Sequence, residues 1–187
     1  MARCAAQPTY VLIADWIDPG PALPRDEALA RLAQRYLAAF APATPEDLAT
    51  WAGLSLTDAR AGWQDVTSQL IEVRVGESTM WLLKAQAEWL DLAPQPPAVR
   101  LVPGFENYLL GYRNRDLILV SEDARRVYTG GGVLHPVLLV DGRGAGTWKL
   151  DRHRKATIVI VESFEELADE VRQGFVAETE DVIRFLS

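Results

Sequence analysis

Residues suited to redox chemistry or metal binding are scarce in this 187-residue sequence. Cys4 is the single cysteine, which excludes an internal disulfide and a cysteine-rich zinc site. His135 and His153 are the only histidines, so a catalytic metal would find few imidazole ligands. We therefore expect neither a metal nor a cofactor.

Long hydrophobic runs are also lacking. No apolar run approaches the roughly 20 residues that a membrane-spanning helix needs, and the opening MARCAAQPTY has no apolar core of a secretory signal. Hydrophobic residues nevertheless make up 49% of the chain, which is ample for a packed core. These features predict a cytoplasmic protein without a membrane contact.

Basic residues are in the minority, since the formal net charge is −7, but they are unevenly spread. Residues 1–98 carry 7 cations and 12 anions, residues 99–155 carry 10 and 6, and residues 156–187 carry 2 and 8. Because salt at 0.1 M confines an electrostatic field to about 10 Å, a basic middle segment can still bind a polyanion. The alternative is a solvated surface of mixed charge.

The pattern of residues 23–93 predicts a winged helix. Apolar residues at helical spacing indicate a helix that ends near Phe40. Thr44 and Asp47 suit the capping box of a second helix, which stops at Gly53, and Ser55 or Thr57 begins a third. Residues 70–75 and 80–83 then read as a β-hairpin around the turn GEST. Three helices followed by a hairpin are typical of the winged helix, whose last two helices form a helix-turn-helix.

The remaining segments make the predicted fold class α+β. Residues 9–17 (TYVLIADWI) indicate a strand without a neighbour in sequence. Residues 85–92 indicate a short helix, and PQPPAV from Pro94 marks a boundary. Residues 94–187 predict a β-rich domain with strands near 100–102, 116–120, 133–140, 144–149 and 157–161. Two acidic helices, 163–174 and 178–186, are expected to close the chain, the first capped by Ser163 and Glu166.

The helix-turn-helix is the first candidate for contact with nucleic acid. Arg60 and Gln64 lie one turn apart on its second helix and can hydrogen-bond to base edges. However, the turn of the expected wing (residues 76–79) offers Glu77 and no cation, and this favours a packing role for the motif.

Two further segments combine cations with aromatic residues. In GFENYLLGYRNRD (104–116), Tyr112 lies beside Arg113 and Arg115; arginines neutralise phosphates, and aromatic rings stack on unpaired bases. The alternative is that the aromatic rings are core and the arginines only face water. The densest basic run follows Trp148 and is predicted to be a loop that contacts anions or a solvated turn; it holds Lys149, Arg152, Arg154 and Lys155.

Residues for catalysis are not evident. Serine, cysteine and histidine form no pattern that pairs a nucleophile with a base. The abundant carboxylates of residues 165–170 resemble a solvated helix face. No catalytic residue is predicted.

Four segments, in order, resemble the AlkZ-like (YcaQ-like) winged-helix family of bacterial DNA glycosylases for alkylated bases and interstrand crosslinks. They are PTYVLIADW, RYLAAFAPATPEDLATWAGL, LVPGFENYLLGYRNRD and GVLHPVLLVDGRGAGTWK. The resemblance implies tandem winged helices around a concave DNA-binding surface, followed by a β-rich region. It also implies that this chain matches only the C-terminal portion of the family, with residues 1–22 as the closing strand of a preceding winged helix.

The family's catalytic motif is Gln–hydrophobic–Gln or Gln–hydrophobic–Asp near the N-terminus. Gln86-Ala87-Glu88 is the nearest approach in this sequence, with the wrong last residue and the wrong place in the chain. The resemblance therefore leaves enzymatic activity uncertain. It predicts a protein that binds double-stranded DNA and lacks the catalytic half, with an N-terminal winged helix or a second copy as possible partners. The alternative is a non-catalytic module for protein interaction or transcriptional regulation.

Overall fold

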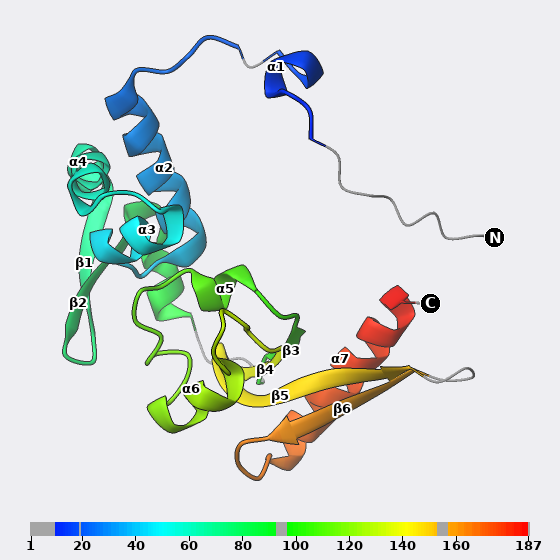
Figure 1. Cartoon of the computed structure of the whole chain (residues 1–187). Coiled ribbons are helices and arrows are strands. Elements are labelled where there is room, and N and C mark those ends of the chain that lie inside the picture. Colours follow the sequence, from blue (N-terminus) through cyan, green and yellow to red (C-terminus); the bar gives the residue numbers. More distant parts are fainter. Residues whose placement is uncertain (1–9, 19, 93–96, 153–156, 187) are drawn as a thin grey trace.

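A computed structural model describes residues 10–18, 20–92, 97–152 and 157–186. The described chain contains a helical unit with a two-stranded hairpin, and below it a four-stranded antiparallel sheet with a long C-terminal helix (Figure 1). The fold is α+β, as predicted. Of the helices in these ranges, none is both long and apolar enough to cross a lipid bilayer.

The helical unit is the predicted winged helix. It comprises α2 (Arg25–Phe40), α3 (Pro45–Ala52) and α4 (Leu56–Val66), followed by the hairpin β1 (Leu70–Val75) and β2 (Ser78–Leu83). The capping box of Thr44 and Asp47 is present, Gly53 ends α3 in the left-handed conformation, and Ser55 caps α4. A bridge between Ala43 and Trp81 ties the α2–α3 connection to the hairpin.

Helix α4 packs closely on α2 because Gly62 has no side chain. A Cβ at this position would lie 2.5 Å from the carbonyl oxygen of Leu29. Around this contact, Ala33, Ala59 and Trp63 are buried.

We expect Gly62→Ala to destabilise the protein by about 1–3 kcal/mol, because the two helix backbones must move apart. Thermal unfolding followed by circular dichroism measures this. Ala61→Ser, at the neighbouring exposed position of α4, is the control and should leave the melting temperature nearly unchanged.

The sheet has the order β3–β4–β5–β6, and every neighbouring pair is antiparallel. Its strands are β3 (Val99–Val102), β4 (Val137–Val140), β5 (Arg143–Arg152) and β6 (Thr157–Ser163). Asp141 and Gly142 both have positive φ in the β4–β5 turn, as the Asp-Gly pair predicts. Helix α7 (Asp169–Leu186) packs against one face of the sheet, where Val99, Leu101, Leu138 and Val171 are buried together.

One buried cluster joins the winged helix to the chain that follows it. It includes Tyr36 and Leu37 from α2 together with Leu109, Ile118 and Leu139. This core therefore crosses the boundary predicted at residue 94. The 3-10 helix η2 (Lys84–Asp91) connects the two regions, and the buried Gln86 side chain donates a hydrogen bond to the carbonyl of Leu37.

Two sequence-based strand predictions were wrong. Residues 13–16 form the short helix α1 (Ile13–Trp16), and no described residue pairs with this segment as a strand. Residues 116–120 form turns, in which Ile118 and Leu119 both donate backbone hydrogen bonds to the carbonyl of Arg115. The side chains of Ile118 and Leu119 are buried, so their apolar character reflects packing in the core rather than a strand.

Two helix predictions were also wrong. The chain closes with the single helix α7, because Gly174 continues the helix; a Cβ there would lie 2.7 Å from Val99 Cγ2. The expected cap at Ser163 is absent because Ser163 instead pairs with Gly146 at the end of β6. Two short helices were not predicted, α5 (Asn107–Leu110) and α6 (Ser121–Val127).

Candidate nucleic-acid interface

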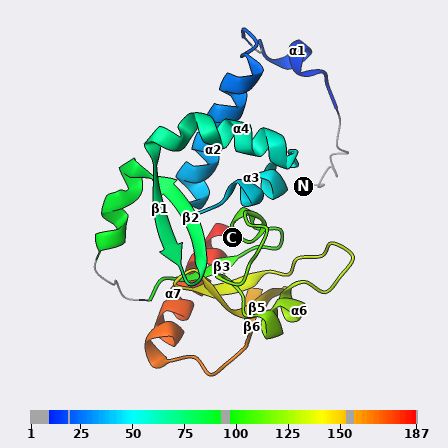
Figure 2. The ribbon, with the colours of Figure 1, turned by 90° about the vertical axis from the view of Figure 1, so that its left-hand side faces the viewer.

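The segment of residues 111–116 is anchored to the winged helix at its first residues. Tyr36 donates a hydrogen bond of 2.6 Å from its hydroxyl to the carbonyl of Gly111. A Cβ on Gly111 would lie 2.5 Å from the ring of Phe40, so only glycine fits beside this ring. Figure 2 shows α3 above the green part of the chain that lies between the winged helix and the sheet.

Asp47 holds the next residue of the segment. One carboxylate oxygen accepts hydrogen bonds from the backbone N–H and the hydroxyl of Thr44, at 2.9 and 2.6 Å. The other oxygen accepts the backbone N–H of Arg113 at 2.8 Å. One buried carboxylate therefore completes the capping box of α3 and fixes the backbone from which the Arg113 side chain extends into solvent. Among the described residues, the Arg113 guanidinium makes no ion pair.

Arg115 is oriented by two contacts. Its Nε donates a 2.6 Å hydrogen bond to the carbonyl of Leu109, and its guanidinium lies 4.8 Å from the ring centre of Tyr128. The Tyr128 hydroxyl donates to the same carbonyl at 3.2 Å. Burial raises the pKa of Tyr128, an effect that Arg115 partly opposes, so the hydroxyl stays protonated as a donor. Within the part of the chain that the structure describes, the two terminal nitrogens of Arg115 have no hydrogen-bond partner, so they are available to an anion.

Arg113 and Arg115 line the same open depression, of about 660 Å³. Asn114, Asp116 and Tyr128 also line it. The depression thus brings two guanidinium groups together, that of Arg113 exposed to solvent and that of Arg115 held in place.

Tyr112 does not take the place predicted for it. Its side chain is only 8% exposed, and its hydroxyl donates a 2.8 Å hydrogen bond to the carbonyl of Phe40. Burial, with Tyr108 and Asp47 nearby, raises the pKa of this hydroxyl. In this conformation the ring cannot stack on an unpaired base; it packs edge-on against Phe40 and Tyr108.

The basic run after Trp148 is divided by the alternation of β5. Lys149 faces a pocket with Arg126 and His135, whereas Trp148 and Leu150 face the α7 side. Arg152 falls on the α7 side by the same alternation, at the end of β5. Arg154 and Lys155 lie outside the described residues.

On the helix-turn-helix, Arg60 is already engaged. Its guanidinium donates a 2.8 Å hydrogen bond to Glu46 of α3. Asp58, on the same helix, pairs with Arg25 at 2.8 Å. Gln64 is exposed. This surface therefore offers Gln64 for base contacts, while Arg60 ties α4 to α3.

We expect Arg60→Ala to change affinity for duplex DNA by less than twofold, because the side chain already has an acidic partner. The exposed ion pair is worth at most about 1 kcal/mol of stability. Fluorescence anisotropy at low salt checks this expectation. A tenfold loss of affinity would instead assign Arg60 to the interface.

Tyr128, Thr129 and His135 lie beside these arginines, and the sequence did not predict them to be part of the interface. Tyr128 supports Arg115, and it also forms a bridge with Leu134. The backbone N–H of His135 donates to Val127, and its imidazole lies 3.1 Å from the hydroxyl of Thr129. Residues 128–135 thus connect the Arg113–Arg115 depression to the pocket of Arg126 and Lys149. The dipeptide Arg125-Arg126 was the available signal, but charge alone does not indicate which face a side chain occupies.

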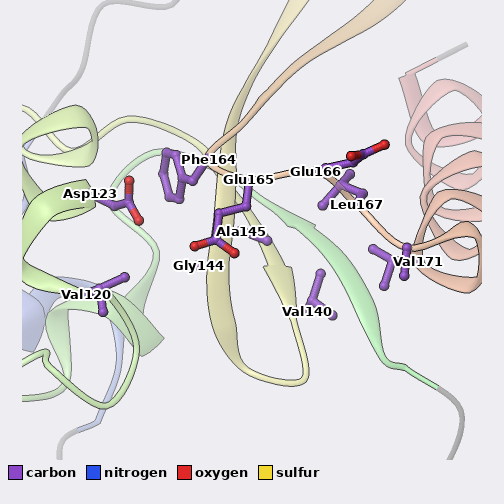
Figure 3. Close-up of a pocket in the computed structure, with 11 residues that line it drawn as sticks. Val120, Asp123, Val140, Gly144, Ala145, Phe164, Glu165, Glu166, Leu167 and Val171 are labelled. Atoms are coloured by element: carbon purple, nitrogen blue, oxygen red, sulfur yellow. The ribbon is translucent and has the colours of Figure 1, made fainter.

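A different pocket is unsuited to an anion. It measures about 260 Å³ and is lined by Asp123, Glu165 and Glu166 among apolar side chains (Figure 3). Phe164 lies between Asp123 and Glu166 in this view. Phosphate would meet like charge here.

A winged helix joined to an antiparallel sheet, with arginines on a loop anchored at the junction, defines an α+β winged-helix protein. Residues 1–185 match the family described as DNA glycosylase AlkZ-like. A curated relative, the interstrand DNA cross-link repair glycosylase of Streptomyces sahachiroi, is 33% identical over 141 residues, which cover 73% of this chain and 37% of the relative. The solved structure of Streptomyces sahachiroi DNA glycosylase AlkZ superimposes with a TM-score of 0.75 at 28% identity, over 91% of this chain and 45% of that one. The chain belongs to the AlkZ-like family, and it spans less than half the length of these relatives.

Proposed function

We propose that this chain binds double-stranded DNA through the Arg113–Arg115 depression and the adjoining surface of residues 128–135 and Lys149. The observation that carries the proposal is the fixed Arg115 guanidinium, held by Leu109 and Tyr128 while its terminal nitrogens have no hydrogen-bond partner among the described residues. A preorganised cation loses little conformational freedom when it meets a phosphate. The name of the related glycosylase supports DNA as the polyanion.

Charge on α7 supports this orientation of the duplex. The helix carries five acidic residues and only the cations Arg172 and Arg184, and both cations are paired with carboxylates. Because α7 covers the opposite face of the sheet from Lys149, DNA on the arginine side avoids most of this acidic surface.

The role we propose for this chain is binding rather than excision. Base excision needs a group that positions or activates water at the anomeric carbon of the sugar, and the described residues near the depression offer arginines, Asn114 and Asp116. Asp116 is exposed, and among the described residues that line the depression it is the only one with a carboxylate. The purified chain should therefore bind DNA containing an alkylated base without releasing the base, as measured by chromatography of the reaction.

The binding itself is tested by anisotropy of a labelled duplex over 25–200 mM salt. We expect affinity to fall steeply with salt, with a logarithmic slope of about −0.9 for each phosphate contacted. Absence of binding even at the lowest salt would contradict the proposal.

A second function, contact with another protein unit, is favoured by one observation. The segment of residues 10–17 exposes apolar side chains, among them Leu12 at 73% and Trp16 at 77%. Such a run is costly to leave in water. Light scattering distinguishes the two functions: a dimer that Trp16→Ser converts to a monomer, without DNA binding, would support the interaction module.

A further inference from the structure

A second pocket lies on the solvent-facing side of β5 and β6, beside α6. It measures about 240 Å³, and Arg126, His135, Thr147, Lys149 and Glu162 line it. Thr147 and Glu162 are opposite each other in the β5–β6 ladder, and Lys149 is opposite Ile160. Two cations, an imidazole and a hydroxyl therefore surround one space, with a single carboxylate among them.

Arg126 is held in place by groups other than that carboxylate. Its guanidinium lies 4.5 Å from the ring centre of Phe164, and one terminal nitrogen is 3.6 Å from Asp123. The other terminal nitrogen donates to Glu162 at 3.1 Å. The Asp123 side chain is only 18% exposed, whereas that of Glu162 is 77% exposed. Since exposed ion pairs contribute little, Glu162 can be exchanged for another anion while Arg126 keeps its position.

His135 and Lys149 supply the other side of the pocket. The bond between the imidazole and Thr129, together with the backbone bond to Val127, fixes the position of His135. Lys149 is exposed and makes no ion pair among the residues that the structure describes. Unlike the acidic pocket of Figure 3, this pocket gathers hydrogen-bond donors around a space large enough for a tetrahedral anion and some water.

We propose that this pocket binds a phosphate group of nucleic acid, with Arg126 exchanging Glu162 for the phosphate and Lys149 and His135 contacting it from β5 and from the segment before β4. The proposal rests on the proposed DNA-binding function for the source of the phosphate. It adds a contact separate from the Arg113–Arg115 depression, and it makes Glu162 an internal competitor of the ligand.

Glu162→Gln gives a test that misfolding cannot imitate, because the expected result is tighter binding. Removal of one negative charge about 4 Å from a phosphate should raise affinity for a duplex at 50 mM salt roughly threefold to fivefold. Glu180→Gln, which removes the same charge from an exposed position on α7, should change affinity by less than half as much. Lys149→Ala should weaken binding roughly tenfold at this salt, as expected for one lost phosphate contact.

Three duplexes of one sequence distinguish the source of the phosphate. One is intact, the second carries a nick with a 5′-phosphate, and the third carries the same nick with a 5′-hydroxyl. If Glu162→Gln raises affinity for all three duplexes, the pocket binds an internal phosphodiester. If it raises affinity only for the duplex with the 5′-phosphate, the pocket binds a terminal phosphate monoester. Equal affinity of Glu162→Gln and Glu180→Gln for every duplex would overturn the pocket while leaving the proposed function intact.

If the wild-type chain does not bind DNA, the proposed function fails. Binding of inorganic phosphate then tests the pocket independently of DNA. Sodium phosphate is titrated into ¹⁵N-labelled protein at constant ionic strength against sodium chloride. A saturable shift of the His135 resonances that Lys149→Ala abolishes would support the pocket. Equal responses to the two salts would overturn it.

Discussion

Replacing Arg113 and Arg115 together by alanine should reduce affinity for duplex DNA by roughly 100-fold at 50 mM salt. Each phosphate contact contributes about −0.9 to the logarithmic salt slope, which corresponds to roughly tenfold in affinity at this salt. The slope of the double variant should accordingly be shallower by about 1–2. Anisotropy of a labelled duplex at four salt concentrations measures both quantities.

The two arginines should not contribute equally. Arg115 is already held by Leu109 and Tyr128, so its single replacement should reduce affinity more than that of the exposed Arg113. Arg184→Ala on α7 is the matched control, because it removes one exposed cation from the opposite face. Equal losses for Arg115→Ala and Arg184→Ala would show that only net charge matters.

Asp47→Ala should have the largest effect on stability. The substitution removes the carboxylate half of the α3 capping box, which we expect to cost about 0.5–2 kcal/mol. It also leaves the backbone N–H of Arg113 without its acceptor, at about 1–3 kcal/mol. A total loss of about 2–5 kcal/mol should lower the melting temperature by roughly 4–20 °C in a chain of this size. Thermal unfolding by circular dichroism measures the change.

Matched variants show whether the hydrogen bonds cause this loss. Asp47→Asn keeps one acceptor oxygen and should recover part of the stability, while Asp65→Ala, at an exposed position of α4, should have little effect. Because the Asp47 carboxylate also positions Arg113, Asp47→Ala should weaken DNA binding even well below the unfolding transition. Unchanged affinity in the folded variant would separate this anchor from the interface.

The elements that local rules specify were predictable from the sequence. The Thr44–Asp47 capping box, the left-handed Gly53 and the Asp141-Gly142 turn each depend on residues within a few positions of one another. Their order along the chain was enough to predict the winged helix. Residues 116–120 were not predictable in this way, because Ile118 and Leu119 are buried against β5 by contacts distant in sequence. There the backbone N–H of Gly144 donates a hydrogen bond to the carbonyl of Ile118.

The candidate site was only partly predictable, because its geometry depends on contacts between residues distant in sequence. Tyr112 and Arg113 are adjacent, yet one is buried against Phe40 and the other points into solvent. Hydrogen bonds across 72 and 66 positions decide this difference. Likewise, the run after Trp148 reads as one basic cluster, but the pleat of β5 directs Lys149 and Arg152 to opposite faces of the sheet.

The central claim is that DNA lies on the face formed by residues 111–116, residues 128–135 and Lys149. Titration of a duplex into ¹⁵N-labelled protein at low salt maps the bound face residue by residue. We predict that amide shifts concentrate on these residues and spare α7. Shifts that concentrate on α4 and the β1–β2 hairpin, with residues 111–116 unchanged, would contradict the account.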